Sequence, residues 1–574
     1  MLLTILPLAR VATTWRVFSE TNDEDAHVSA GLEWMLRGTY DRDAEHPPLA
    51  RAAFAILPVL SGERGIAAKE YFDRNGDYRH NLALARAGNL IFLLIALVVV
   101  AVWAYRLFGT FTALLALALF GALPPVLGHA GLATTDTAAM AMTLLALFVF
   151  VRWRNGWLIG LAIGLGLLSK FSFIVFFPVA AVVFIASRRS MPRVLQLAIA
   201  AFVAALTVWA GYRFSTGTLA GARSKMVFDE SVQLIAAQYA RAPGYEWVRP
   251  DIVARYRDYA GDAAKHGVSG IDFVDWAKAA GYPSPAAGRS GRDTMIGAPP
   301  VERRGGALEP LRALLQRIDV HVPLPAPQFF IGIEKVQRHS SLGHAAFLLG
   351  RYSTSGWWYY FPVVFFFKTP LAFVLLSIAG IVLLVRRGDA EGRGIALAPL
   401  AMLVPATTSG INIGLRHILP IYPFLAICAA VAAIELWRWK KWAAVIVLAW
   451  YFVASAIAHP DYVAYFNEAA GRHPENIAVD SNLDWGQDML RLADYVKRHH
   501  IEHIHVSVFG NWPRFHMPAE ELRRGERATG WIAISEMELK FGGANNRGEG
   551  YEWLAAYKPV RRIGKSIRLY YIPK

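Results

Sequence analysis

Cysteine is almost absent from this chain of 574 residues, and charged side chains are sparse. The single cysteine, Cys428, lies inside an apolar run, so an intrachain disulfide is excluded and cysteine usage says nothing about the compartment. Charged residues make up 18% of the chain and hydrophobic residues 55%, and the hydrophobic residues occur in blocks too long for soluble cores. The sequence therefore predicts a membrane protein.

Acidic residues are fewer than basic ones, 44 against 59, which gives a formal net charge of +15. An excess of this size is compatible with nucleic-acid binding, but many of the basic residues stand in short clusters beside apolar runs. That placement is typical of membrane orientation signals. We therefore expect membrane lipids, and no nucleic acid, as partners.

Runs of roughly 20 apolar residues, the length that crosses a bilayer, recur along the chain. They cover residues 89–108, 111–127, 137–153, 194–211, 360–385, 395–407, 418–437 and 442–458. Residues 156–187 form a longer run that is interrupted only at Ser169 and Lys170, which predicts two spans joined by a tight turn. The apolar stretch 2–18 is short, and we take it as a first span because it lacks the basic start and cleavage site of a signal peptide. The fold class predicted is a polytopic α-helical membrane protein with about eleven transmembrane helices.

Basic clusters predict the orientation of these spans. Alternate threading places the following residues on one side: Arg106, Arg152, Arg154, Arg188, Arg189, Arg193, Arg386, Arg387, Arg393, Arg438, Lys440 and Lys441. By the positive-inside rule this side is cytoplasmic. The protein is then expected in a bacterial inner membrane, with nearly all of its candidate chemistry on the extracytoplasmic side.

The predicted domain organisation follows from this threading. Residues 1–458 form a transmembrane domain that includes a first outer loop, 20–79, and a large extracytoplasmic insert, 212–357. Within the insert, residues 280–306 are rich in Gly, Pro, Ser and Arg, which predicts a flexible loop. Residues 459–574 follow as an extracytoplasmic module. Strand-like alternation at 503–509 and helical periodicity at 487–499 predict a small α/β fold for this module.

The first outer loop combines acids and histidines with two amphipathic stretches. Asp23, Glu24 and His27 stand at the start of the first stretch, and His46 precedes two prolines that force an extended entry into the second stretch, 49–60. Two interfacial helices with these residues on their connections would form a site at the boundary between water and lipid. The alternative is an acidic N-cap on an interfacial helix, and the pattern alone does not choose between the two.

Motifs along most of the chain resemble those of one enzyme group in their order and outward placement. They lie at residues 23–27, 45–49, 128–129, 133–136, 166–170, 339–350, 356–362, 368–370, 412–417 and 480–488. The group is the glycosyltransferase C superfold (GT-C), and the resemblance is to its protein O-mannosyltransferase and aminoarabinose transferase families, whose first outer loop carries an Asp-Glu pair. The short first span and the long insert 212–357 depart from the family pattern.

The resemblance implies a reaction. Family members move a sugar from a polyprenyl phosphate carrier to an acceptor outside the cytoplasm, so a GT-C fold and an inverting, mannosyltransferase-like transfer to a lipid, glycan or protein acceptor of the cell envelope are expected here. Protein O-glycosylation is one such transfer. The alternatives are a membrane transporter or flippase and a non-catalytic binder of lipid-linked sugars. A transporter is disfavoured because its ionisable residues would lie near the membrane midplane. In this chain the charges cluster at the outer ends of the spans, and Lys368 is the main exception.

Roles for the acidic residues follow from this chemistry. An acceptor hydroxyl is a poor nucleophile, so a carboxylate must draw its proton, and Asp23 is the predicted base. Glu24 would orient Asp23 or bind the acceptor, while His27 and His46 are assigned to substrate binding. Asp136 would position a sugar hydroxyl. For Asp136 the alternative is a simple helix cap.

Cations are needed for the phosphate that leaves with the lipid carrier. Arg416, beside His417 at the outer end of a span, is the first candidate because its planar fork can bind two phosphate oxygens. Lys170 and Arg213 are second choices. The alternative for Arg416 and Lys170 is snorkelling to lipid headgroups.

Metal binding is not required by the pattern. We expect no obligatory cofactor, although Asp23, Glu24 and His27 offer donors for a divalent ion. In the tail, residues 480–488 are interpreted as a solvated loop rather than a metal site because their acids lack the full calcium-loop spacing.

Overall fold

The computed structural model describes residues 2–188, 193–222, 321–386, 389–542 and 550–573, with a few isolated residues between 252 and 281. The chain divides into two compact units. The first comprises Met1–Arg37, Pro47–Thr207 and Gln337–Lys574, and the second comprises Gly38–His46 and Val208–Val336. Nearly all of the predicted flexible loop 280–306, most of the insert, and Arg189 and Arg387 lie outside the described residues.

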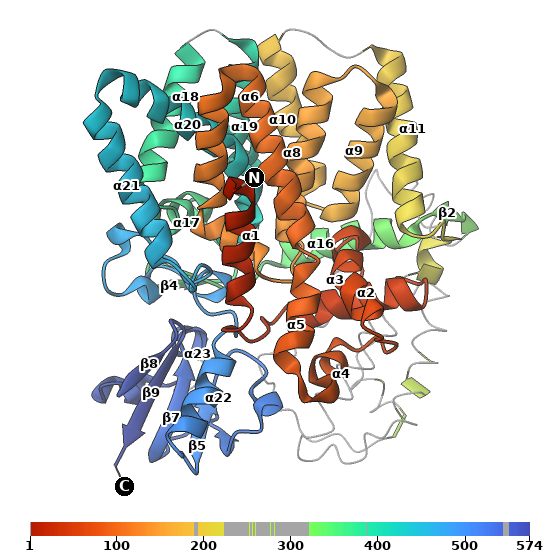
Figure 1. Ribbon diagram of the computed structural model, residues 1–574. Coiled ribbons are helices and arrows are strands. Elements are labelled where there is room, and N and C mark those ends of the chain that lie inside the picture. The colour runs from red at the N-terminus through yellow and green to blue at the C-terminus, as the bar shows by residue number, and fades with distance from the viewer. Residues whose placement is uncertain are drawn as a thin grey trace, which may run out of the picture. The chain divides into compact units, whose positions relative to one another are not determined.

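The first unit is mostly helical (Figure 1). Its N-terminal helices are α1 (Leu2–Thr14), α2 (Glu24–Leu36), α3 (Pro48–Leu60), α4 (Ala68–Asp73), α5 (Tyr78–Ala87), α6 (Leu90–Gly121), α7 (Pro124–Ala130), α8 (Asp136–Arg152), α9 (Gly156–Ser169), α10 (Phe173–Arg188) and α11 (Val194–Gly211), whose last residues, 208–211, belong to the second unit. After the insert come α17 (Tyr360–Lys368), α18 (Leu371–Arg386), α19 (Ala390–Ala406), the 3-10 helix η2 (Leu415–Ile421), α20 (Tyr422–Trp439) and α21 (Lys441–Ile457). α8, α9 and α10 contact one another side by side.

Three helical segments in the described part of the chain are long and apolar enough to cross a membrane. They are Tyr78–Gly121, Val194–Gly211 and Leu415–Trp439, and the pair Tyr360–Lys368 and Leu371–Arg386 makes a fourth if it counts as one span. Shorter apolar helices are Leu2–Thr14, Pro48–Leu60, Gly156–Ser169, Phe173–Arg188 and Lys441–Ile457. The chain is an integral membrane protein with at least three apolar spans, and the count of about eleven stays a prediction.

Several predicted spans differ in detail from the helices. The run 360–385 is not one helix, because α17 and α18 are bent by 118° where Thr369 and Pro370 interrupt them. Proline removes a backbone donor and disfavours helix in the residue before it, which explains the bend. The run 89–108 corresponds to the first part of α6, and the run 111–127 covers the second part of α6 and the start of α7. The two parts of α6 meet at Gly109, whose φ of 80° favours glycine.

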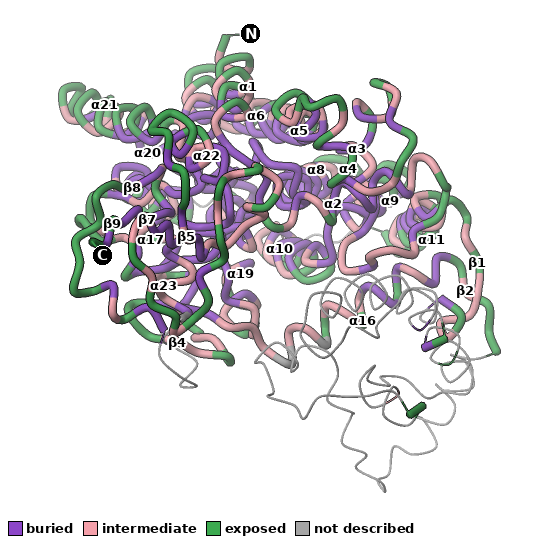
Figure 2. Tube along the Cα trace, turned by 90° about the horizontal axis from the view of Figure 1, so that it is seen from below, coloured by how far each residue is buried: buried purple, intermediate pink, exposed green. Residues whose placement is uncertain are grey.

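Burial separates the helices into inner and outer ones (Figure 2). α20 is an inner helix, with every residue from 422 to 433 buried. Gly380 lets α18 approach α20 closely, since a Cβ at this position would lie 1.9 Å from the Cys428 carbonyl oxygen. α11 is only 22% buried, and α21 exposes Ile446 and Ile457. Exposed apolar helices of this length are expected to face lipid.

One buried charge cluster ties together helix ends from α8, α10 and α19. Glu391, near the start of α19, accepts from Arg152 Nη1 over 3.2 Å and from Trp103 Nε1 over 2.8 Å, and it also pairs with Arg188. Arg152 and Arg188 are the last residues of α8 and α10. The two arginines therefore share one end of the bundle, as the alternate threading predicts.

The tail contains a five-stranded sheet and a flanking helix. Its strands are β5 (Ile504–Ser507), β6 (Ala519–Glu521), β7 (Gly530–Ser535), β8 (Arg561–Ile563) and β9 (Ile567–Ile572), in the order β6-β5-β7-β9-β8. β5 is parallel to β6 and to β7, whereas β9 is antiparallel to β7 and to β8. The predicted helix at 487–499 is α22 (Met489–Arg498), and α23 (Glu536–Gly542) follows β7.

Short elements complete both units. In the first unit, β3 (Ala346–Leu348) pairs with β4 (Arg351–Ser353), and short 3-10 helices occur at Arg74–Gly76, Glu468–Ala470, Pro474–Asn476, Asp480–Asn482, Trp512–Phe515 and Glu552–Ala556. In the second unit, β1 (Thr216–Gly217) pairs with β2 (Leu324–Pro325), and the first part of α16 (Pro327–Leu342) supplies Ile331 to a small apolar core.

Candidate active site

Four charged residues from separate parts of the first unit form an ion-pair network. Arg416, in η2, donates from Nη1 to Oδ2 of Asp23 over 2.6 Å, and the same nitrogen lies 4.0 Å from Oδ2 of Asp136. Lys170 donates from Nζ to Oδ1 of Asp136 over 2.5 Å. Asp23 is the most exposed of the four side chains, at 29%, whereas Asp136 is 1% exposed. The structure thus brings together four of the residues singled out in the sequence.

Asp136 and Lys170 meet because two helix ends come together. Asp136 is the first residue of α8, and Lys170 follows α9 in extended backbone before α10 begins. Gly166 lets α9 approach α10, since a Cβ there would lie 2.2 Å from the Phe173 ring. The Asp136 carboxylate is occupied by Lys170, which is itself only 8% exposed. Neither helix capping nor snorkelling to headgroups therefore describes these two side chains.

The segment 480–488 is buried, so its interpretation as a solvated loop is wrong. Its three acids are 8%, 1% and 0% exposed: Asp480, Asp484 and Asp488. The rest of the tail supplies hydrogen bonds to two of these acids, because Met537 donates its N–H to Asp484 and Ser566 donates its hydroxyl to Asp488. Buried polar groups need such partners, which the local spacing of acids could not reveal.

The segment 480–488 also contacts Arg416 and the backbone beside it. The Leu415 N–H donates to Oδ1 of Asn482 over 3.0 Å, which fixes the backbone beside Arg416. The Arg416 guanidinium lies 4.3 Å from the centre of the Trp485 ring. A cation over an indole face is attracted by the ring quadrupole, so Trp485 helps to hold the guanidinium between the two acids of the network.

The backbone that leads to Asp23 rests on this segment as well. The Ser19 N–H donates to the Gln487 carbonyl over 3.0 Å, and the Asn22 N–H donates to the Trp485 carbonyl over 3.1 Å. Residues 480–488 therefore position both Asp23 and Arg416, two residues that lie far apart in the sequence.

Glu24 is fully buried in an ion pair with Arg86. The Arg86 Nε and Nη2 atoms donate to the two Glu24 oxygens over 2.8 and 2.7 Å, and both side chains are 0% exposed. The N–H groups of Thr21 and Ala133 donate to the same carboxylate over 2.8 and 2.7 Å. Burial raises the pKa of Glu24, but Arg86 and these hydrogen bonds lower it below its usual range. Of the two predicted roles, this environment suits orientation of Asp23 and leaves no exposed oxygen for an acceptor.

Asp23 is a carboxylate near neutral pH. Burial raises its pKa, but the Arg416 guanidinium and then His27 lower it, and the net shift is downward. His27 is 3% exposed, and its Nδ1 accepts from Nε of Arg51 over 3.1 Å. Arg51 thus fixes the orientation of the His27 ring.

Several buried polar atoms around the network have no hydrogen-bond partner among the described residues. They include Oδ2 of Asp136, Nε of Arg416, Nε2 of His417, Nδ1 of His129 and Oγ1 of Thr134. Burial lowers the pKa of His129 to about 3, an effect that Asp136 only partly opposes, so the ring is neutral. Unpaired buried groups are costly, and their gathering at one place indicates a site whose hydrogen bonds serve a bound molecule.

Comparison with protein families finds a glycosyltransferase match over part of the chain. Residues 46–260 match the model of glycosyltransferase family 87. The matched region contains Asp136, Lys170 and Arg213 and begins at His46. The glycosyltransferase resemblance of the sequence motifs is thereby confirmed. A comparison with curated proteins finds no match.

Solved structures to which this chain is similar include ArnT from Cupriavidus metallidurans bound to undecaprenyl phosphate. The identity is 12%, with 99% of this chain and 97% of that chain covered and a TM-score of 0.41. Another is the archaeal oligosaccharyltransferase AglB from Archaeoglobus fulgidus in complex with an inhibitory peptide and a dolichol-phosphate. Its identity is 13%, with 92% of this chain and 61% of that chain covered and a TM-score of 0.43.

Asp480 joins the candidate site, although the sequence did not single it out as a site residue. It is 8% exposed and adopts a left-handed φ of 58°, which is uncommon outside glycine. Burial raises its pKa to about 6; Arg416 lowers the pKa and Asp23 raises it, so Asp480 lies within the electrostatic reach of both. The one signal in the sequence was its place in a family-like motif.

His46 and Arg213 belong to the second unit. The Tyr40 hydroxyl donates to the His46 carbonyl over 2.7 Å, and Arg213 has a left-handed φ of 54° beside Gly38. Their assignment to substrate binding stays a prediction.

The divalent ion considered for the first outer loop lacks a converging ligand set there. Asp23 pairs with Arg416, the Glu24 oxygens face Arg86, and His27 accepts a hydrogen bond at Nδ1. In the described residues, the group of three potential ligands close enough to share an ion lies in the tail: His503, His505 and Glu520.

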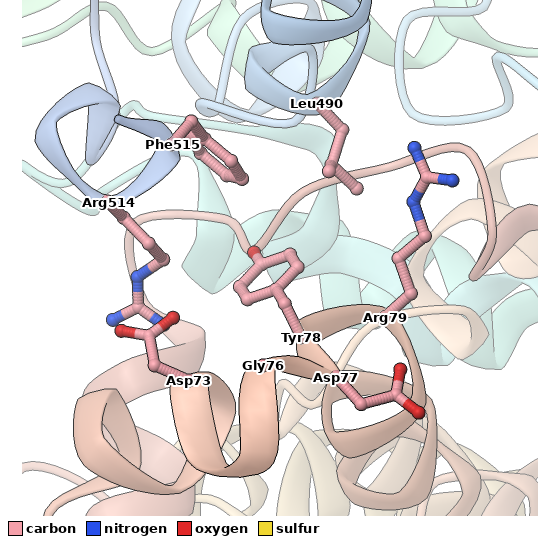
Figure 3. Close-up of a pocket in the computed structure, with 8 residues that line it drawn as sticks. All are labelled: Asp73, Gly76, Asp77, Tyr78, Arg79, Leu490, Arg514 and Phe515. Atoms are coloured by element: carbon pink, nitrogen blue, oxygen red, sulfur yellow. The ribbon is translucent and has the colours of Figure 1, made fainter. Parts of the chain in front are cut away.

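A separate pocket lies between the first outer loop and the tail and contains none of the predicted site residues (Figure 3). It is lined by Asp73, Gly76, Asp77, Tyr78, Arg79, Leu490, Arg514 and Phe515. Arg514 Nη1 lies 3.6 Å from Asp73 and 3.2 Å from the buried carboxylate of Glu20. Burial raises the pKa of Glu20 to about 7 against the lowering effect of Arg514. Because this pocket contains none of the four residues of the ion-pair network, we assign the chemistry to that network instead.

Proposed function

We propose that the protein transfers a sugar from a polyprenyl phosphate carrier to a lipid, glycan or protein hydroxyl at the extracytoplasmic face of the bacterial inner membrane. The observation that carries this proposal is the ion-pair network, which sets a partly exposed carboxylate beside cations at the ends of apolar helices. A base and a phosphate-binding cation are the two groups that this transfer requires. The carrier class rests on the family resemblance.

The proposed step forms one bond and breaks one. The acceptor oxygen attacks the anomeric carbon and passes its proton to Asp23, while the bond from that carbon to the phosphate oxygen breaks. The lipid phosphate leaves with the bonding electrons, and the sugar configuration inverts. Arg416 and Lys170 stabilise the charge that develops on the phosphate.

If Arg416 exchanges Asp23 for the donor phosphate, donor binding makes Asp23 a stronger base. In the described structure the Arg416 guanidinium lowers the pKa of Asp23. A donor phosphate that draws Arg416 away removes this countercharge, and the pKa of Asp23 then rises toward a value better suited to accepting a proton. The same exchange leaves Asp136 paired with Lys170 and able to bind a sugar hydroxyl through Oδ2.

The outward placement rests on the charges at the two ends of the helices. α8 carries Asp136 at its first residue and Arg152 at its last, and the latter belongs to the cluster around Glu391. If the arginine-rich end is cytoplasmic, the network lies on the outer side.

A transporter remains the competing function, and Lys368 was its main support. Lys368 donates to the backbone carbonyls of Val463 and Asn482 over 2.6 and 2.5 Å, so its contacts join the tail to α17. This arrangement suits a structural role better than a place on a transport path.

An assay in detergent solution distinguishes sugar transfer from transport. Transport requires a membrane between two compartments, whereas the transfer of a sugar gives a product without one. Purified protein would be mixed with a lipid extract and an envelope fraction from a strain that lacks the gene, and the products would be analysed by mass spectrometry. We expect a mass increase of one sugar on an acceptor. A protein that forms no such product, although the extract contains the lipid-linked donor, would not be a transferase.

A further inference from the structure

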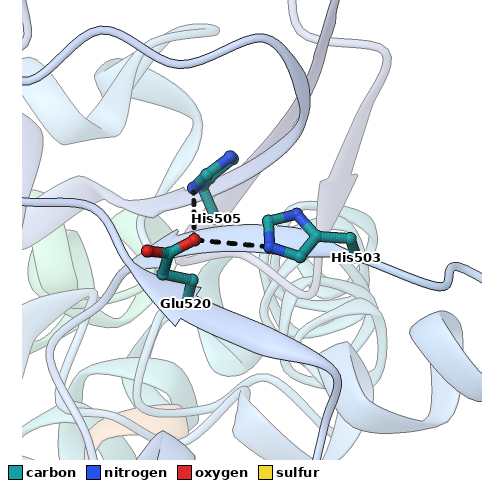
Figure 4. Close-up of side chains that lie close together, drawn as sticks. All are labelled: His503, His505 and Glu520. Carbon is teal, nitrogen blue, oxygen red and sulfur yellow. Dashed lines mark ion pairs between the residues drawn. The ribbon is translucent and has the colours of Figure 1, made fainter.

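Two histidines and a glutamate meet on the solvent side of the tail sheet (Figure 4). His505 lies on β5 and His503 two residues before it, so both point to the same face of the strand. Ile504 and Val506, which alternate with them, are 0% exposed in the core beneath. Glu520, on β6, is the direct partner of His505 in the strand register.

The donor atoms approach one another closely. One oxygen of Glu520, Oε2, lies 3.4 Å from Nε2 of His503 and 3.9 Å from Nδ1 of His505. Metal bonds of 2.0–2.1 Å in a tetrahedral zinc site place the ligand atoms about 3.3 Å apart. All three donor atoms lie within 4.8 Å of one another, so side-chain rotations can bring them to this geometry.

From this arrangement we propose that His503, His505 and Glu520 form a binding site for Zn²⁺. Two imidazoles and one carboxylate are a donor set that zinc accepts, whereas Mg²⁺ and Ca²⁺ prefer oxygen ligands. Side-chain exposures of 57% for His503 and 67% for Glu520 give the ion a path from solvent. Three protein ligands leave a fourth position for water or for an oxygen of another molecule.

Zinc at this site would stabilise the pairing of the edge strand β6 with β5. β6 is three residues long, lies at the edge of the sheet and, within the described part of the chain, pairs only with β5. A metal bound by His503 and His505 on one side and by Glu520 on the other adds a second connection between β5 and β6. Zinc binding should therefore stabilise the folded tail, because a ligand that binds only the folded state shifts unfolding in its favour.

Zinc titration of the purified full-length protein tests this proposal. After treatment with EDTA and removal of the chelator, the protein in detergent would be titrated with ZnCl₂ by calorimetry, alongside thermal unfolding with and without zinc. We expect one equivalent of zinc to bind and to raise the Tm. MgCl₂ should have neither effect.

Variants decide whether these three residues hold the ion. His505→Ala and Glu520→Gln should each weaken binding by more than the roughly 10–100-fold that loss of an outer-shell partner costs. His499→Ala, an exposed histidine of the same module, is the matched control and should bind as the unmodified protein does. Equal binding in His505→Ala and the unmodified protein, or no binding in either, would overturn the proposal. An equal Tm increase with MgCl₂ would also overturn it.

Discussion

Replacement of Glu24 by Gln should unfold the protein at a lower temperature, because it leaves Arg86 buried without its countercharge. Both side chains are 0% exposed, and two hydrogen bonds join them. Breaking a buried pair by removing one partner costs about 3–5 kcal/mol. Arg86 keeps only its bonds to the carbonyls of Phe18 and Ser19, which offset part of this cost.

The double variant Glu24→Gln, Arg86→Met provides the control. It removes both charges, so its loss of stability should be smaller than the sum of the two single losses. The Tm values of Glu24→Gln, Arg86→Met and the double variant would be measured in detergent at one protein concentration, with tryptophan fluorescence as the signal. A Glu24→Gln variant that keeps the Tm of the unmodified protein but loses transfer would refute the reasoning, since Glu24 would then act on the substrate directly.

Three other perturbations have expected outcomes. Lys170→Met should reduce transfer by at least about tenfold, because Asp136 and the leaving phosphate both lose a cation; equal activity would remove Lys170 from the site. Burial raises the pKa of Asp484 to about 8, so the folded state holds the extra proton and stability should fall as pH rises from roughly 4 to 8. In Asp484→Asn this fall in Tm should be smaller, and an unchanged pH profile would contradict the assignment. Glu391→Gln should lower the Tm because Arg152 and Arg188 lose their shared carboxylate; Glu435→Gln, on an exposed surface pair, is the matched control and should leave the Tm unchanged.

Local hydrophobic pattern predicted the helices well where nothing interrupted it. The run 194–211 coincides with α11, and the tight turn at Lys170 separates α9 from α10. The bend between α17 and α18 was missed because hydropathy continues across Thr369 and Pro370. Hydropathy reports the preference of a segment for lipid and not the direction of its axis.

Candidate site residues were predictable where charge stood out against an apolar background. Asp136, Lys170 and Arg416 each flank an apolar run, and their charges required partners. The Arg86 partner of Glu24 was not predictable, since it is separated by 62 positions and resembles an ordinary basic residue before a span. Burial of the segment 480–488 likewise depends on contacts with distant parts of the chain.

Asp23 as the catalytic base is the central claim, and complementation of a strain that lacks the gene tests it most directly. Asp23→Asn would be compared with Asp25→Asn, whose carboxylate makes a partly exposed pair with Lys69 over 3.7 Å. Membrane levels and Tm values would be matched, and the envelope lipids, glycans and proteins would be analysed by mass spectrometry. The account predicts that Asp25→Asn restores the sugar-bearing product and that Asp23→Asn, though folded, does not. Restoration by Asp23→Asn to the level of the unmodified protein would contradict it.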